Sequence, residues 1–217
     1  APSTTPVIQG TWYHVAASFA TTGTNGTIYL YVNGVLQNSG GNSIGGTPRY
    51  TAAASAFIGT PSPLPGGWVA TSGYIRDLRV VQGGVVPTAT FTPLAAAPFS
   101  YTLPSYVTGS GSVVFTLLGQ FQLYNPIGKY GSSMVLNNQP GATSTATYVK
   151  YTTGISLSTA TGFTLCAWIK PLAVGISGNQ TFISVSNGTT FFIFQIDANQ
   201  TSIHFYGQNP YTVPNVI

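Results

Sequence analysis

Acidic side chains are almost missing from this chain of 217 residues, which contains two aspartates and no glutamate. Only 4% of its residues are charged. Enzymes that hydrolyse glycosidic bonds place two carboxyl groups on either side of the scissile bond. Because Asp77 and Asp197 are the only acidic side chains and lie far apart in the sequence, we expect no catalytic residues and no enzymatic activity. Asp77 stands between Arg76 and Arg79, which predicts an ion pair that holds a strand.

Histidine and cysteine are equally scarce. With only two histidines, one cysteine and two aspartates in the chain, no zinc cluster is available, so we expect no metal site. A Ser–His–Asp site needs a histidine beside a carboxylate. We interpret His14 as a buried structural residue and His204 as solvent-facing. Cys166 cannot form an intrachain disulfide, and its apolar surroundings favour a small buried side chain.

Long apolar runs and clusters of basic residues are absent too. No stretch of about 18 consecutive apolar residues occurs, so we expect no membrane-spanning helix. Residues 1–6 lack a basic region followed by an apolar core, which predicts no signal peptide and a chain that is processed or is a segment of something longer. The net charge of +4 comes from scattered Lys and Arg residues, and nucleic acid is therefore not an expected partner.

Short apolar runs between Gly, Pro, Asn and Ser clusters are abundant, and they predict an all-β chain. Residues 12–19 alternate, with Trp12, His14, Ala16 and Ser18 on one face. The dipeptide Asn33-Gly34 predicts a type I′ hairpin. The Pro-rich segments 59–67 and 87–104 cannot be central strands. Strands are expected within 12–19, 27–32, 35–36, 56–59, 73–81, 113–118, 148–151, 163–169, 181–185, 190–196 and 202–206.

Four segments, in this order, resemble the C-terminal half of laminin-G-like, concanavalin-A-like domains. They are Trp12-x-His14-Val15-Ala16, residues 28–34, Phe57-Ile58-Gly59 and residues 73–80. The resemblance implies an antiparallel β-sandwich of the jelly-roll type. The tail Thr90-Phe91-Thr92-Pro93 is similar to the laminin-G modules of phage tail and large-DNA-virus virion proteins.

Residues 131–217 resemble the N-terminal half of the same family, through 162–170, 181–184 and 192–196. The family halves therefore stand in reversed order: 1–98 is the C-terminal-half-like segment, 99–130 a linker over the surface, and 131–217 the N-terminal-half-like segment. Either half alone exposes sheet edges. The sandwich can be completed within the chain, by neighbours in a tandem array, or by exchange between chains. We favour completion within the chain, because the two segments together make one sandwich of ordinary size.

The resemblance implies a non-enzymatic structural or adhesive surface module, located on a virion surface or outside the cell, as a capsid-associated or fibre component. Its expected partners are other structural proteins or copies of itself. The alternative function is a lectin domain that recognises a host glycan. No cofactor is expected. Many family members bind calcium at a rim, but here Asn33 replaces the family's Asp, and fewer carboxylates weaken calcium binding.

Aromatic side chains in loops are the candidate carbohydrate-binding residues. Trp12 and Trp168 match core positions of the family motif, which leaves Trp68 in the loop 66–68 as the expected platform. The candidate site is Trp68, Tyr50, Tyr74 and Asn33, with Tyr211 as a further companion. Asn-x-Thr sequons make four residues candidates for glycosylation, namely Asn25, Asn179, Asn187 and Asn199.

Overall fold

The computed structural model describes a set of segments that contains every strand discussed below. They are residues 5–22, 25–37, 42–45, 54–59, 68–84, 89–93, 107, 112–117, 134–136, 149–155, 162–173, 178–186, 191–197 and 202–208. All regular elements in these segments are β-strands, which confirms the predicted all-β fold. No helix among the described residues is long and apolar enough to cross a membrane.

Fourteen strands are described. In chain order they are β1 (Tyr13–Thr22), β2 (Asn25–Val32), β3 (Val35–Leu36), β4 (Asn42–Gly45), β5 (Ala54–Ile58), β6 (Trp68–Ala70), β7 (Gly73–Gln82), β8 (Ser112–Leu117), β9 (Met134–Leu136), β10 (Val149–Ile155), β11 (Gly162–Pro171), β12 (Asn179–Ser186), β13 (Phe191–Ile196) and β14 (Ile203–Gln208).

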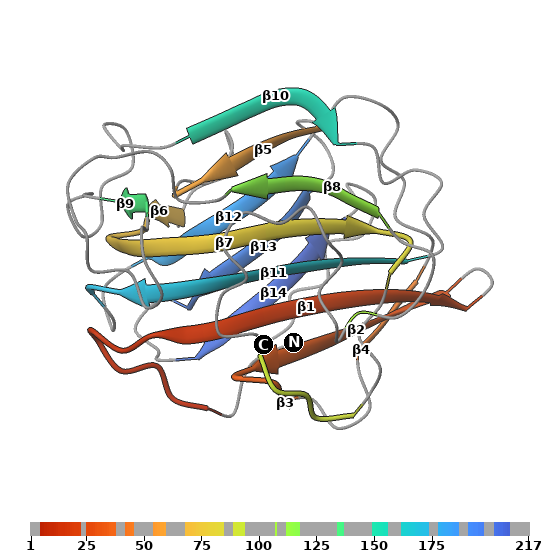
Figure 1. Cartoon of the computed structure of the whole chain (residues 1–217), viewed down its shortest axis with the longest axis horizontal. Helices are drawn as coiled ribbons and strands as arrows, with labels where there is room; N and C mark the ends of the chain where they lie inside the picture. Colours follow the sequence, from red (N-terminus) through yellow and green to blue (C-terminus); the bar gives the residue numbers. More distant parts are fainter. Residues whose placement is uncertain are drawn as a thin grey trace.

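The strands form two sheets that pack face to face as a sandwich (Figure 1). The larger sheet has the order β3-β2-β1-β11-β7-β8, with β4 beside β2 and β9 beside β7. The smaller sheet has the order β10-β5-β12-β13-β14, with β6 beside β12. All pairings are antiparallel except that of β6 with β12. The predicted antiparallel sandwich is therefore confirmed.

The core lies between the sheets and follows from strand alternation. Tyr13, Val15, Ala17 and Phe19 of β1 are buried in it, and the residues between them face the other way. Phe19 stacks on Phe163 of the neighbouring strand β11 at a ring-centroid distance of 5.5 Å. Each fully buried side chain of the size of Val15 or Phe19 contributes roughly 1.5–3 kcal/mol to folding stability. The alternation therefore fixes which face of β1 points inward.

Strands from residues 1–98 and 131–217 alternate in both sheets. In the larger sheet β11 lies between β1 and β7, and in the smaller sheet β5 lies between β10 and β12. Neither segment therefore forms a complete sheet by itself in this structure. That the two segments are family halves in reversed order stays a prediction.

The segment 99–130, predicted to be a linker, contains the strand that the sequence pattern predicts within 113–118. Its residues 112–117 form β8, which pairs with β7 at the edge of the larger sheet. Unlike β8, the short strands β4, β6 and β9 were not expected from the sequence pattern. Each of them is attached to the side of a longer strand, so its conformation depends on that partner more than on its own apolar pattern.

The predicted hairpin at Asn33-Gly34 is confirmed. Asn33 has φ 52° and Gly34 has φ 79°, and the two residues join β2 to β3. The side-chain Oδ1 of Asn33 accepts a hydrogen bond from the backbone N–H of His14 at 3.0 Å. The Phe91 N–H in turn donates to the Gly34 carbonyl at 3.0 Å, so residues 89–93 lie against the hairpin.

Candidate functional site

The outer face of the larger sheet, which is the side turned away from the smaller sheet, carries an unusual set of side chains. Trp12, His14, Ala16 and Ser18 belong to this face, as the alternation predicts. Strand register arranges its residues in cross-strand rows. The first is Trp12–Lys170–Tyr74, the second His14–Trp168–Arg76, and the third Tyr31–Ala16–Cys166–Arg79. Aromatic and basic side chains thus occupy a face that is polar in many sandwiches.

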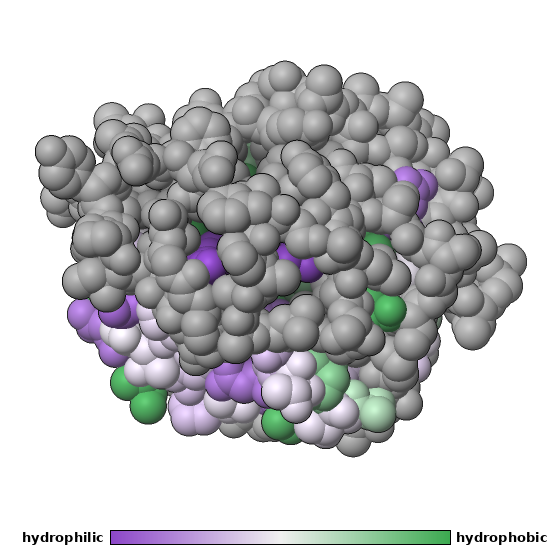
Figure 2. Space-filling model, in the orientation of Figure 1, coloured by the Kyte–Doolittle hydropathy of each residue, from purple (hydrophilic) through white to green (hydrophobic). Residues whose placement is uncertain are grey.

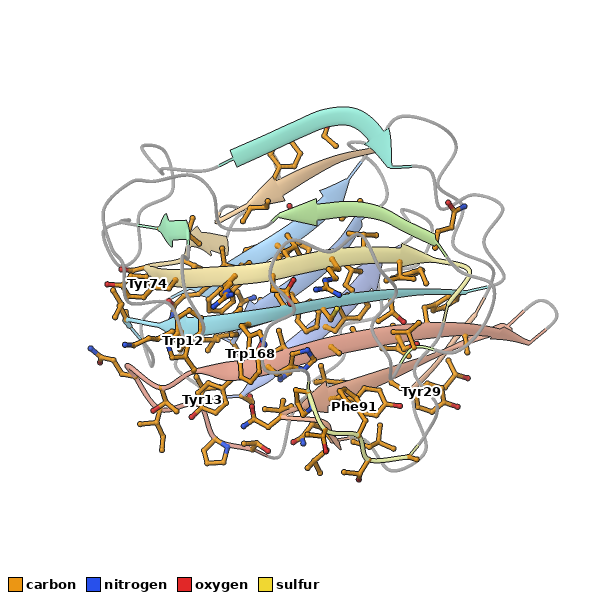
Figure 3. The ribbon with its side chains drawn as sticks, viewed as in Figure 1. Trp12, Tyr13, Tyr29, Tyr74, Phe91 and Trp168 are labelled. Atoms are coloured by element: carbon orange, nitrogen blue, oxygen red, sulfur yellow. The ribbon has the colours of Figure 1, made fainter. Side chains whose placement is uncertain are left out.

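The first row, Trp12–Lys170–Tyr74, lies at the end of the sheet and is called the rim row below. Trp12 directly precedes Tyr13, whose partner on β11 is Ile169, so Trp12 falls opposite Lys170. Lys170 pairs in turn with Tyr74 of β7. All three side chains are partly exposed. Figure 3 shows Trp12 and Tyr74 close together near the left end of the strands.

The rings of the rim row form an open angle. The Trp12 and Tyr74 ring centroids are 6.3 Å apart and the ring planes are inclined by 43°. The Lys170 Nζ lies 5.6 Å from the Tyr74 ring centroid, a cation–π distance. The two aromatic rings and the ammonium group are therefore held together by the register of three strands.

Close backbone packing fixes this end of the sheet. A Cβ atom at Gly73 would lie 2.5 Å from the Lys170 carbonyl oxygen, so β7 approaches β11 more closely than a larger residue would permit. The Gly10 N–H donates to the Pro171 carbonyl at 2.8 Å, and the Leu172 N–H donates to the Ser72 carbonyl at 2.9 Å. Hydrogen bonds therefore fix the backbone beneath the rim row on both sides of β11, to the residues that precede β1 and to those that precede β7.

The second row is buried. His14 makes edge-to-face contacts with Trp168 at 5.3 Å and with Phe91 at 5.8 Å between ring centroids. Burial, with a further contribution from the positive charge of Arg79, lowers the pKa of His14 from 6.5 to about 3. The expectation of a buried structural histidine is confirmed, although His14 lies beneath Phe91 on the outer face and not between the sheets.

Tyr31 lies in the third row and is also covered by Phe91, at 5.3 Å between ring centroids. Burial, followed by the influence of Tyr29, raises the pKa of Tyr31 to about 12. Tyr31 and His14 therefore both stay neutral near pH 7. This middle part of the face is packed by the chain itself and offers no charged imidazole or phenolate for chemistry.

Asp77 forms the ion pair that its neighbours predict. Its Oδ1 lies 2.9 Å from Nη2 of Arg79, and the Arg79 Nε also donates to it. Asp77 has φ 50° at an irregularity in the β7–β11 pairing, between the pairs Trp168–Arg76 and Cys166–Arg79. Its side chain is 15% exposed and that of Arg79 3%. The carboxylate thus compensates a buried guanidinium group within its own strand.

Asp197 meets a histidine and a serine on the smaller sheet. The His204 Nε2 lies 2.9 Å from the Asp197 Oδ2 and 3.3 Å from the Ser202 Oγ. A catalytic relay requires the carboxylate on one imidazole nitrogen and the serine on the other. Here both groups contact the same nitrogen, so His204 cannot be oriented by Asp197 and accept the Ser202 proton at once. His204 alternates with the core residues Ile203 and Phe205, as the sequence predicts, and its pairing with Asp197 leaves its side chain 12% exposed.

Among the described residues, no group of three or more His, Cys, Asp or Glu side chains is placed to hold a metal ion.

Comparison with known proteins gives one match. Residues 1–87 match the concanavalin A-like lectin/glucanases superfamily. The match covers less than half of the chain, and it includes β1, β2 and β7, which carry most of the outer face. The superfamily's description joins lectins, which bind carbohydrate, with glucanases, which cleave it. No curated protein and no solved structure gave a match to this chain.

The structure does not bring the described candidate carbohydrate-binding residues together in one site. Tyr74 lies in the rim row. The backbone of Trp68 begins strand β6 beside Asn179, so it does not lie in the loop that the sequence predicted. Asn33 is part of the β2–β3 turn, where its side-chain oxygen is bonded to His14. Tyr50 and Tyr211 lie outside the described residues.

The glycosylation candidates are only partly described. Asn179 is partly exposed at the beginning of β12, and Asn25 begins β2. Asn187 and Asn199 lie outside the described residues. Attachment of sugar at any of the four stays a prediction.

Trp12 is the site residue that the sequence interpretation missed. The family motif assigns it to the core, yet it lies partly exposed beside Tyr74. The alternation of residues 12–19 was the available signal, since it places Trp12 with His14 and opposite to Tyr13. An aromatic residue on the face that does not fill the core is a candidate for the surface.

Proposed function

We propose that the chain is a non-catalytic adhesive or structural module on the outside of an extracellular assembly. One observation carries this proposal: both acidic side chains of the chain are already paired with basic groups, on different sheets. Asp77 contacts Arg79, and Asp197 contacts His204. No two carboxyl groups are left to flank a glycosidic bond, which both retaining and inverting hydrolases need.

A virion surface is the assembly that we propose. Support comes from the tail Thr90-Phe91-Thr92-Pro93, which resembles laminin-G modules of virion proteins and packs through Phe91 on the outer face. The chain has few charged groups and is rich in Thr, Ser, Asn and Gly. Its partners in this proposal are other structural proteins or copies of itself. The proposal needs no cofactor, and calcium is not part of it.

Antibody labelling of intact particles tests the location. Antibodies raised against the purified chain should label particles released by the source cells before any detergent is added, and the chain should sediment with those particles. Labelling that appears only after particle disruption, or a chain that stays in the supernatant, would contradict a surface role.

The rim row favours a second candidate function, a lectin. Partly exposed aromatic rings beside an ammonium group are able to stack on a sugar ring and to hold a polar substituent. A glycan array probed with the whole chain distinguishes the two functions. Binding to a defined glycan class supports the lectin, and the absence of any ligand at millimolar concentration supports the purely structural module.

A further inference from the structure

We infer that the rim row binds an acidic saccharide, meaning a sugar that carries a carboxylate or a sulfate group. This inference rests on the proposed adhesive function and assigns it a place on the molecule. The expected arrangement is a pyranose ring against Trp12 or Tyr74 with its anionic group directed to Lys170.

The first support is the geometry of the rings. At 6.3 Å and 43° the Trp12 and Tyr74 rings do not close on each other as a parallel stack would. Both rings are partly exposed, while the next aromatic residue on the same face, Trp168, is only 5% exposed. Aromatic area is thus accessible at the rim and covered further along the face.

Exposed apolar residues gather at the same end. Ile8 is 61% exposed and Leu172 is 36% exposed, and they are two of the three exposed large hydrophobic residues among those described. The backbone of Gly10 is hydrogen-bonded to that of Pro171. Ile8 and Leu172 stand close to these two residues in the sequence, so they lie at the same end of the sheet as the rim row. Gln9 and Thr11 beside them are exposed and polar. The rim therefore combines apolar surface with hydrogen-bonding groups. A sugar ring has the same combination of apolar C–H faces and polar edges.

In Figure 2, which views this side of the molecule, strongly hydrophobic described residues appear as separate spots among polar ones. The described residues that are visible in this view form no broad apolar patch of the kind that permanent protein interfaces use. A small ligand with polar edges fits this surface better than a large apolar partner.

The charge of Lys170 selects an acidic ligand. The chain has two acidic side chains, and they pair with Arg79 and His204, so neither supplies a counter-ion to Lys170. With a net charge of +4 the chain also does not repel anions over longer distances. A carboxylate or sulfate on the ligand would form a charge-assisted hydrogen bond with the Lys170 ammonium.

Calorimetric titration of the whole chain tests this site. The probes are a galacturonic acid hexasaccharide, a chondroitin sulfate hexasaccharide, the neutral cellohexaose and poly-glutamate. The chain should bind one or both acidic saccharides more tightly than cellohexaose. Lys170→Gln should weaken acidic binding roughly tenfold or more, the effect of one hydrogen bond to a charged group, and should weaken cellohexaose binding much less.

Tyr74→Leu and Trp12→Leu should weaken binding of all sugars, because each removes a ring while keeping apolar volume. Lys150→Gln is the matched control for charge, since Lys150 lies on β10 of the other sheet. Tyr29→Leu is the matched control for a ring, since Tyr29 lies on the same face but away from the rim row (Figure 3). Circular dichroism shows whether each variant keeps the wild-type fold.

The outcomes separate the inference from the function on which it rests. Acidic sugar binding that the rim variants leave intact would overturn the inference and keep the adhesive function. Equal affinity for neutral and acidic probes would overturn the acidic specificity. Binding of poly-glutamate in place of every sugar would assign the row to an acidic peptide. No binding of any probe overturns the inference, and particle labelling then tests the structural function independently.

Discussion

His14 is held between Trp168 and Phe91, only 3% exposed, and close enough to Arg79 to be influenced by its charge. A proton on its imidazole would be a second buried positive charge beside that guanidinium. Protonation of His14 in the native chain therefore requires a pH near 3, whereas His14 in the unfolded chain takes up the proton near pH 6.5. His14 therefore links folding stability to pH.

Stability should consequently fall as the pH is lowered below 6.5, because the unfolded state then binds a proton that the native state does not. The His14 contribution is fully present above pH 6.5 and is lost progressively down to about pH 3. Between pH 6.5 and pH 4 it amounts to a loss on the order of 3 kcal/mol. Urea unfolding at a series of pH values measures it.

His14→Phe should flatten this pH dependence, and His204→Gln measures what the other imidazole contributes. An acid slope that is the same in His14→Phe and in the wild-type chain would show that His14 is not its source.

At the scale of elements, the crossing of residues 89–93 over the β2–β3 turn brings Phe91 onto His14 and Tyr31 of the outer face. Gly34 permits it: a Cβ atom there would collide with the Phe91 carbonyl oxygen. Gly10 has nearly the same backbone angle, φ 77° against φ 79° for Gly34, but open space where its Cβ would lie. The two glycines form a matched pair.

Gly10→Ala should cost about 1–2 kcal/mol of unfolding free energy, the strain of a left-handed residue with a Cβ. Gly34→Ala should cost about 1.5–3 kcal/mol more, because the segment must move and Phe91 loses its burial on His14 and Tyr31. Chemical denaturation of both variants measures the difference. Equal losses would show that the segment is not packed against the turn.

The longer strands and the hairpin strand β3 could be predicted from the sequence, and the short strands β4, β6 and β9 could not. β1, β7 and β11 carry alternating or continuous apolar runs whose burial is strong enough to fix both strand and face. β4, β6 and β9 have three or four residues of ambiguous pattern, and each pairs with the side of a longer strand. The partners of β6 and β9 also lie far away in the sequence. Tyr74 was a candidate from the sequence, but its grouping with Trp12 and Lys170 was not predicted, because the register of β1, β11 and β7 brings the three residues together.

At the scale of the whole molecule, the position of β11 between β1 and β7 makes the two segments dependent on each other. A fragment of residues 1–98 lacks β11, the strand that is hydrogen-bonded to both β1 and β7. The fragment therefore exposes apolar residues such as Val15 and Val80. Such a fragment has open sheet edges and an uncovered core.

Fragments 1–98 and 99–217 should each lack cooperative unfolding when purified alone. Mixed in equal amounts, they should recover the circular dichroism spectrum and the cooperative transition of the intact chain. A monomeric 1–98 fragment that unfolds cooperatively by itself would mean that the sandwich does not need the second segment.

Native mass spectrometry of the chain with a galacturonic acid hexasaccharide tests most directly whether this sandwich binds without cleaving. Long incubation should give the mass of the chain plus one intact hexasaccharide, with no shorter sugar in solution, because Asp77 and Asp197 are committed to Arg79 and His204. Shorter saccharides that accumulate with the wild-type chain and vanish with Asp77→Asn or Asp197→Asn would contradict the account and identify a hydrolase.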